Sequence, residues 1–243
     1  MTIERRTEWG SRAAALYTEP YAARYRAHDE TACEGRTVAS LGAWLRAVCD
    51  RFGRPIDVLD LGCGTGRYFH ALAHVHHLVG IDVSQPMLER ARRPVGDVPV
   101  AADRLALVEG DFLEHEFDAG EFDLVYSVGV LGEHAPFDET IAARVGRWLR
   151  PNGRFAFTTV HPSSASVKRT LKRRAGEWLL TAAPAAWRRG LRDRLMRDGL
   201  YADQERVRDV LHRVGLEPES IEPFESDVHL HVRAVARKCS EPR

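Results

Sequence analysis

Hydrophobic and polar residues along the chain follow two alternating patterns, which together predict an α/β fold. Short apolar runs are typical of strands buried on both faces of a parallel sheet, and they occupy residues 56–61, 78–82, 105–109 and 122–127. Residues 154–160 alternate and are predicted to form the fifth strand. Apolar residues at helical spacing fill the segments 37–52, 85–93, 137–149 and 203–214. Two further strands, 216–224 and 228–236, are predicted to lie antiparallel at the edge. The pattern therefore predicts a doubly wound, mostly parallel, seven-stranded sheet with one antiparallel edge strand.

The length of 243 residues suits one α/β domain with a buried core. We expect a single domain in four parts: an N-terminal helical cap (1–53), a core (54–160), a basic helical insertion (161–200), and a final helix with two strands (201–243). In the cap, Tyr17, Tyr21 and Tyr25 recur at a spacing of four, on one face of a helix. This face predicts packing against the sheet or a lid over a ligand site.

The first strand leads into glycines at every second position: Gly62, Gly64 and Gly66. A helix is predicted to follow over 68–77. A strand, a glycine turn and a helix form the geometry of a nucleotide site, because the turn must be tight and the backbone must approach the ligand closely. The N-terminus of the helix then offers unpaired N–H groups to polar ligand atoms.

Details of this turn favour one class of ligand. A dinucleotide fingerprint has the spacing G-x-G-x-x-G, whereas here the spacing is G-x-G-x-G and Arg67 occupies the place of the third fingerprint glycine. Asp60 lies two residues before the first glycine, where its carboxylate would repel a pyrophosphate and attract an ammonium or sulfonium group. S-adenosylmethionine carries both of these cations and no phosphate. A nicotinamide-dependent oxidoreductase, the alternative enzyme class, is therefore disfavoured.

The segment Asp60-Leu-Gly-Cys-Gly-Thr-Gly66 resembles motif I of the class I S-adenosylmethionine-dependent methyltransferases. The segment that follows the second strand and the turn Arg150-Pro-Asn-Gly153 are similar to further motifs of that family, so the resemblance covers residues 56–160. It implies a Rossmann-like fold. It also implies a cofactor site, in which Asp82 binds the ribose, Met87 packs near the adenine and Asp111 accepts from the adenine amino group. The implied cofactor-binding residues are Asp60, Gly62, Cys63, Gly64, Gly66, Asp82, Met87, Asp111, Phe112 and Ser127.

The family has no universal catalytic residue, because the cofactor already activates the methyl group. A hydroxyl acceptor usually needs a general base, and candidates must lie beyond the fourth and fifth strands. His134, Glu133 and His161 meet that condition, and an imidazole has a suitable unperturbed pKa for a base. The alternative for each is a side chain that only shapes the pocket. No metal site is predicted, because the His residues lack a third ligand nearby in the sequence.

Charge is balanced over the whole chain, with 35 basic and 35 acidic residues, but one segment departs from this balance. Residues 168–197 contain ten basic and two acidic residues, so this basic segment carries +8 and the remainder carries −8. A solvated helical insertion is one interpretation, and a basic lid that attracts an anionic substrate is the other. No apolar run is long enough to span a membrane, no signal peptide is evident, and four scattered cysteines favour reduced thiols in the cytoplasm.

The sequence therefore predicts a cytoplasmic enzyme that transfers a methyl group from S-adenosylmethionine to an O or N atom of a small, anionic metabolite. A methyltransferase acting on RNA, such as transfer RNA, is the alternative substrate class. We disfavour it because no RNA-binding module is evident and the remainder of the chain would repel a long polyanion. A module that binds the cofactor without catalysis is the alternative of another functional class.

Overall fold

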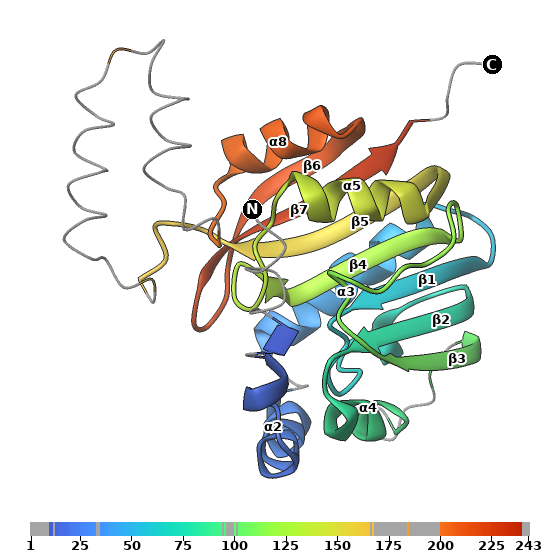
Figure 1. The fold of residues 1–243 in the computed structure, drawn as a ribbon, viewed down its shortest axis with the longest axis vertical. Coiled ribbons are helices and arrows are strands. Elements are labelled where there is room, and N and C mark those ends of the chain that lie inside the picture. The colour runs from blue at the N-terminus through green and yellow to red at the C-terminus, as the bar shows by residue number, and fades with distance from the viewer. Residues whose placement is uncertain are drawn as a thin grey trace.

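The computed structural model describes residues 10–239 except 12, 33–34, 94, 96–99, 101, 166, 168–183 and 185–199. A seven-stranded sheet in the order β3-β2-β1-β4-β5-β7-β6 forms its centre (Figure 1). The strands are β1 (Ile56–Leu61), β2 (Val75–Asp82), β3 (Ala102–Glu109), β4 (Phe122–Leu131), β5 (Leu149–Val160), β6 (Leu216–Glu225) and β7 (Leu230–Lys238). The predicted fold class is confirmed.

Strands β1 to β5 are parallel, and β7 is the antiparallel strand. It lies one strand in from the edge, because it pairs with β5 on one side and with the edge strand β6 on the other. The interior position suits β7, whose residues are mostly buried, while β6 is largely half-exposed and contains Pro218 and Pro223. Proline lacks an N–H donor and is tolerated at a sheet edge.

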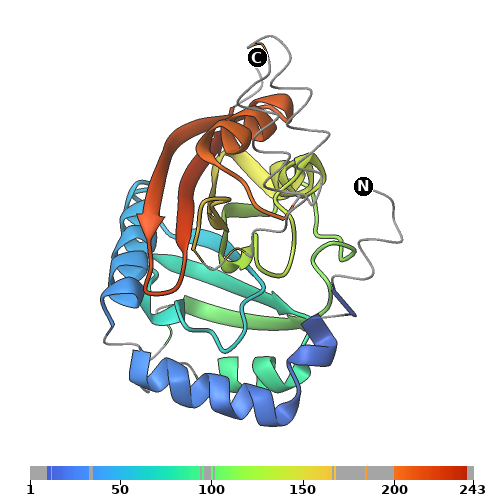
Figure 2. The same cartoon turned by 90° about the vertical axis from the view of Figure 1, so that its left-hand side faces the viewer.

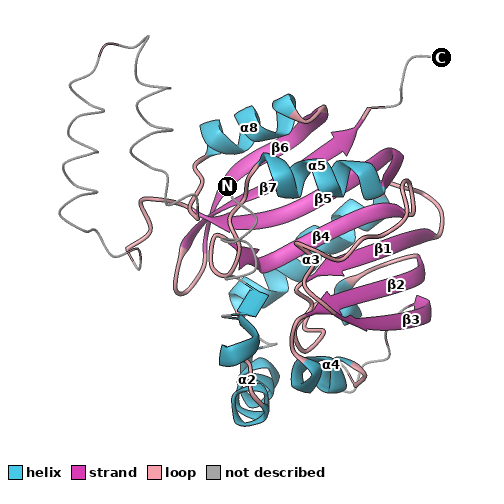
Figure 3. Cartoon of the chain, viewed as in Figure 1, coloured by secondary structure: helices cyan, strands magenta, loops and turns pink. Residues whose placement is uncertain are grey.

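Helices cover both faces of the sheet, as Figures 1 and 2 show. On one face, α5 (Glu139–Trp148) and α8 (Gln204–Arg213) pack in a cluster with Phe155 and Phe157 of β5. On the other face, α3 (Arg36–Asp50) and α4 (Gln85–Ala91) pack with Val58 and Tyr126. Side-chain N-caps begin three of these helices, at Ser84, Asp138 and Asp203. The N-terminal α2 (Glu19–Ala32) runs beside α4 (Figure 3).

The prediction of a helix over residues 68–77 is wrong. Only a 3₁₀ turn, η1 (Phe69–Ala71), follows the glycine loop, and β2 already begins at Val75. Hydrogen bonds of the i→i+3 type from Phe69 to Gly66 and from Ala71 to Tyr68 close this turn. Because residues 68, 69, 71, 72 and 73 are all buried, they present no polar face that a surface helix would expose.

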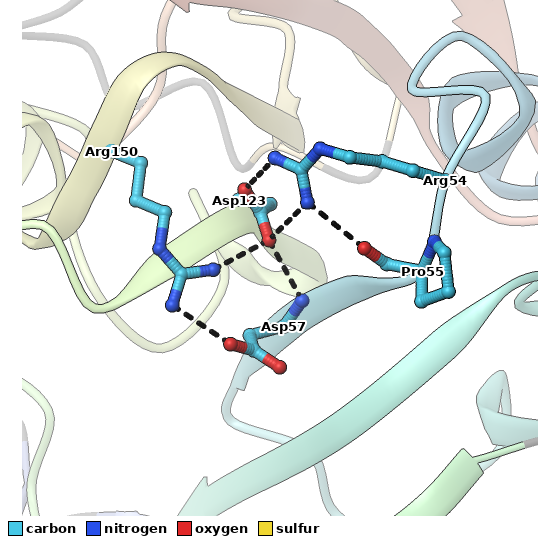
Figure 4. A network of polar contacts seen from close by, with 5 residues as sticks. All are labelled: Arg54, Pro55, Asp57, Asp123 and Arg150. Carbon is cyan, nitrogen blue, oxygen red and sulfur yellow. Dashed lines mark hydrogen bonds and ion pairs between the residues drawn. The ribbon is translucent and has the colours of Figure 1, made fainter.

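A shared ion-pair network joins three elements at the amino end of β4 (Figure 4). The carboxylate of Asp123, which is 1% exposed, accepts from Arg54 at 2.6 Å, from Arg150 at 2.6 Å and from the backbone N–H of Asp57 at 2.9 Å. Arg150 also pairs with the Asp57 side chain at 2.8 Å. The network holds the starts of β1 and β4 to the turn in β5, at the end of the sheet opposite to the expected ligand site.

Within the described residues, none of the helices combines the length and apolar character that a membrane crossing requires. The basic segment 168–197 lies outside the described residues apart from Pro184. The predicted division of the chain into cap, core, insertion and C-terminal part stays a prediction.

Candidate functional site

A pocket that is open to solvent lies at the carboxyl ends of the central parallel strands. The carboxyl end of an open α/β sheet is where such folds bind ligands. Of the predicted cofactor residues, the lining includes Asp60, Gly62, Cys63, Gly64, Asp82, Met87, Asp111 and Phe112. Of the predicted catalytic residues, it includes His134.

Two glycines of the loop, Gly62 and Gly64, have backbone conformations that side chains rarely adopt. Gly62 has a φ of +71°, and a Cβ there would lie 2.7 Å from the Val130 side chain. Gly64 has a φ of +54° and uses its N–H to donate to the Asp82 carboxylate at 2.9 Å. Both positions therefore need glycine, since an L side chain rarely adopts this backbone conformation. The result is a bare backbone wall on one side of the pocket.

Asp60 forms the floor of the pocket next to this wall. It is only 4% exposed, and no ion pair to it is found among the described residues. Burial, and then the nearby Asp82, raise the pKa of Asp60 to about 8, although its neighbour Tyr126 lowers it in part. A carboxyl group that is costly to ionise in the bare protein is a good partner for a cationic ligand, which would restore its charge.

Asp82, at the end of β2, has a carboxylate fixed from two sides. Its Oδ2 accepts from Gly64 N and its Oδ1 from Ser84 N, both at 2.9 Å. A carboxylate offers more acceptor sites than these two contacts use, so Asp82 can also accept from ligand hydroxyls. Burial raises the pKa of Asp82, while these backbone N–H groups oppose the rise. The geometry fits a vicinal diol such as that of a ribose.

Asp111, Phe112 and Met87 also line the pocket. The Oδ1 of Asp111 accepts from Leu113 N at 2.8 Å, which fixes the carboxylate, and burial raises its pKa. Phe112 and Met87 are buried, at 8% and 2% exposure. An apolar slot with one fixed acceptor at its rim suits a flat ring that carries an amino group.

Two predicted cofactor residues lie behind the lining instead of within it. Ser127 is fully buried and donates to the carbonyl of Leu61 at 3.0 Å, so it links β4 to β1. Gly66, with a φ of +73°, closes the glycine loop, and a Cβ there would lie 2.8 Å from the Phe69 ring. Both residues shape the site through the backbone around them.

The three predicted catalytic residues occupy different environments. His134 lines the pocket, and burial lowers its pKa. Glu133 lies next to it, where burial raises its pKa to about 7 against the opposing effect of Arg67. His161 is outside the lining, and its Nδ1 accepts from Ser163 N at 3.0 Å within its own turn. The described residues contain no cluster of three or more His, Cys, Asp or Glu that could hold a metal ion.

The N-terminal segment contributes to the site through the tyrosine face, for which the sequence left sheet packing and a lid open, and through Asp29, which the sequence analysis missed. Tyr17 and Tyr25 line the pocket, and the buried Asp29 pairs with Arg67 of the glycine loop and accepts from Thr65. The signal was present, because Asp29 continues the spacing of four set by Tyr17, Tyr21 and Tyr25. A buried acid on an otherwise aromatic stripe calls for a cationic partner from another element.

Comparisons with known proteins agree with this geometry. A family model described as a methyltransferase domain matches residues 58–153. Nocamycin O-methyltransferase from Saccharothrix syringae is 38% identical over 112 residues, which are 42% of this chain and 37% of that protein. Sterol 24-C-methyltransferase from Debaryomyces hansenii is 32% identical over 102 residues, or 41% of this chain and 26% of that protein. The matched region thus spans well under half of the length of either relative.

The solved structures extend the likeness of fold over most of the chain. Magnesium protoporphyrin IX methyltransferase from Synechocystis, determined with bound SAH, superposes with a TM-score of 0.56 at 19% identity. The alignment covers 87% of this chain and 86% of that one. Residues 58–153 therefore resemble a methyltransferase domain, and the solved structure shows that the fold of such an enzyme extends over most of the chain.

Proposed function

We propose that the chain binds S-adenosylmethionine in this pocket and transfers its methyl group to a small-molecule acceptor. The observation that carries the proposal is the arrangement of Asp60, Asp82 and Asp111 at the ends of three strands around a bare glycine loop. Each carboxyl matches a different part of that cofactor. A nicotinamide dinucleotide would place its pyrophosphate against the glycine loop, close to the buried Asp60 carboxyl.

The residues that would hold the cofactor follow from this geometry. Asp60 faces its cationic amino-acid end, Asp82 accepts from the two ribose hydroxyls, and Asp111 accepts from the adenine amino group. Gly62, Cys63 and Gly64 provide backbone contact, while Met87 and Phe112 enclose the ring. When bound, the cofactor supplies a methyl group that is already activated for transfer. The protein then has to align the acceptor and exclude water.

Among the predicted bases, His134 is the one that we assign to the reaction, since it lines the pocket and burial keeps its imidazole neutral. A neutral imidazole can accept a proton from an acceptor hydroxyl as that oxygen attacks. Glu133, with a pKa of about 7, is the next candidate. His161 is third, because it lies outside the pocket lining.

The acceptor we propose is a small anionic metabolite that receives the methyl group on O or N, in the cytoplasm. The curated relatives above are named for methylation of a natural product and a sterol, both small molecules. One relative is named as an O-methyltransferase and the other as a C-methyltransferase, so the names do not define the acceptor atom. The proposal of O or N as the acceptor atom depends instead on the assignment of His134 as the base. The charge of the acceptor rests on the basic segment, whose Arg residues suit carboxylate or phosphate groups.

Incubation of the protein with methyl-labelled cofactor and a metabolite extract tests the proposal. We expect a labelled small molecule that is absent when the protein is omitted. Tight binding of cofactor without any labelled product would favour a binding module. Preferential binding of a nicotinamide dinucleotide would overturn the assignment.

A further inference from the structure

We propose that Tyr17 is a catalytic residue that receives the acceptor's proton and passes its own phenolic proton to Nε2 of His134. This inference rests on the proposed function and gives the site a tyrosine–histidine pair in place of a single base. Its starting point is one contact: the Tyr17 hydroxyl lies 2.6 Å from His134 Nε2, and both residues line the pocket.

The contact joins two distant parts of the chain, since Tyr17 precedes α2 and His134 follows β4. The rings of Tyr17 and His134 meet edge to face, with centroids 5.4 Å apart. The rings of Tyr21 and Tyr25 also meet the Tyr17 ring edge to face, with centroids 5.1 and 6.4 Å away. The Tyr17 hydroxyl therefore has little freedom to turn away from the imidazole.

A side-chain hydrogen bond to its backbone carbonyl ties Tyr17 to the ribose end of the pocket. Its carbonyl accepts from Ser84 Oγ at 2.7 Å, and Ser84 N donates to Asp82 at 2.9 Å. Asp82, Ser84, Tyr17 and His134 thus form a continuous set of contacts across the pocket. The same segment that places the hydroxyl is fixed beside the carboxylate that we assign to the ribose.

The direction of the Tyr17–His134 hydrogen bond follows from the two neutral forms. Burial raises the pKa of Tyr17, and Tyr25, Tyr21, Asp82 and Glu133 raise it further, so the phenol keeps its proton. Burial lowers the pKa of His134, so the imidazole carries only one proton. A phenol is the stronger acid of the two, so its O–H donates to Nε2 and the imidazole proton lies on Nδ1. The lone pairs of the Tyr17 oxygen are then the acceptors that an incoming hydroxyl meets.

The proton step balances without any further reactant. The acceptor O–H bond breaks as a new O–H bond forms at Tyr17, while the original Tyr17 O–H bond breaks and an N–H bond forms at His134 Nε2. The electron pair left on the acceptor oxygen would form its bond to the methyl carbon that the bound cofactor supplies, and the cofactor's sulfur would leave with the electron pair of the broken carbon–sulfur bond. His134 becomes an imidazolium, and Glu133, the adjacent residue, can offset that charge when ionised. Tyr17 is neutral before and after the step.

Nitrogen-15 NMR of the histidine-labelled parent, saturated with S-adenosylhomocysteine, tests the pair without an acceptor. We expect His134 to show a protonated Nδ1 and an unprotonated, hydrogen-bonded Nε2. In Tyr17→Phe the tautomer population should shift toward a mixture, whereas Tyr21→Phe, which alters the same aromatic cluster, should leave it unchanged. A parent spectrum with the proton on Nε2 would overturn the proposal, even if the protein is a methyltransferase.

Kinetics supply the second test once a labelled product has been found. Tyr17→Phe and His134→Gln should each lower kcat by roughly 10²-fold, the scale of a lost proton acceptor, with unchanged S-adenosylhomocysteine affinity. The double variant should be no slower than the slower single variant, because residues that act as a unit are not additive. Tyr21→Phe should stay within a few-fold of the parent. Independent losses that multiply in the double variant would show that Tyr17 does not act through His134.

Discussion

Three carboxyl groups in one pocket differ in how they are held. Asp82 and Asp111 accept from backbone N–H groups, at 2.8–2.9 Å. Asp60 is almost fully buried, and its pKa is raised to about 8, so at neutral pH it is mostly protonated in the bare protein. A cationic ligand reverses this preference, because an opposite charge nearby favours the ionised form.

Cofactor binding should therefore release a proton from Asp60. Between pH 6 and 7.5 the affinity for S-adenosylmethionine should rise with pH, by up to about tenfold per unit, since the complex binds fewer protons than the free protein. Calorimetry in two buffers of different ionisation enthalpy should show close to one proton released near pH 7. Asp60→Asn removes the titrating group, so its binding should be weaker and release no proton. An equal proton release in that variant would exclude Asp60 as the source.

Asp82 should contribute to cofactor affinity through its hydrogen bonds. We expect Asp82→Ala to weaken binding of S-adenosylhomocysteine by about 1.5–3 kcal/mol, the scale of hydrogen bonds to a charged group. Titration calorimetry measures the change. The control is Asp103→Ala, a surface acid at the start of β3 whose side chain is 75% exposed. Unchanged affinity in Asp82→Ala would remove this carboxylate from the site.

At the scale of elements, the strands could be predicted because β1, β2 and β4 are buried on both faces and appear as apolar runs in the sequence. The absence of a helix after the glycine loop could not be predicted from the sequence, because η1 packs against α3, where Gly42 lies close to Ala71. That contact spans distant parts of the chain. The Asp29–Arg67 pair and the Tyr17–His134 contact are equally long-range, so only the stripe that carries Asp29 and Tyr17 was visible in the sequence.

The network around Asp123 joins three elements, so its loss should lower the stability of the whole fold. Asp123→Ala leaves Arg54 and Arg150 without their shared carboxylate. Their side chains are 55% and 36% exposed and can turn to water, so we expect a loss of about 2–3 kcal/mol, below the usual cost of breaking a fully buried pair. Urea unfolding monitored by circular dichroism measures the change. As a control, Glu222→Gln breaks the 2.8 Å pair with Arg233 at a side chain that is 54% exposed, and it should cost less than about 1 kcal/mol.

The same network should weaken in acid. Burial raises the pKa of Asp123, but its hydrogen bonds to Arg54 and Asp57 and the charge of Arg150 outweigh this and lower it overall. A lowered native pKa means that the stabilisation is present above the unfolded value and is lost as pH falls through the native value. The stability difference between parent and Asp123→Ala should therefore be full at neutral pH and shrink below about pH 4. A difference that stays constant down to pH 2 would contradict this account.

At the scale of the whole molecule, charge is separated between the basic segment and the rest of the chain. The pocket itself is lined by Asp60, Asp82 and Asp111, and the only Arg or Lys among its described lining residues is Arg67, whose charge is paired with Asp29. An anionic acceptor would gain little attraction from these groups. Its attraction must come from elsewhere, and the +8 of residues 168–197 is the source that the sequence offers.

Neutralising Arg173, Arg174, Arg188 and Arg189 together, each to Gln, should therefore raise the Michaelis constant of the acceptor and leave cofactor affinity unchanged. A small anion engages one or two of these groups, so the effect should vary mildly with salt. A matched variant with Arg36, Arg46, Arg92 and Arg104 changed to Gln removes the same charge outside the segment and should leave the constant near that of the parent. Unchanged kinetics in the first variant would mean that the segment is a solvated surface. Tight binding of transfer RNA by the parent that falls steeply with salt would instead make nucleic acid the acceptor, because a polyanion releases many counterions at once.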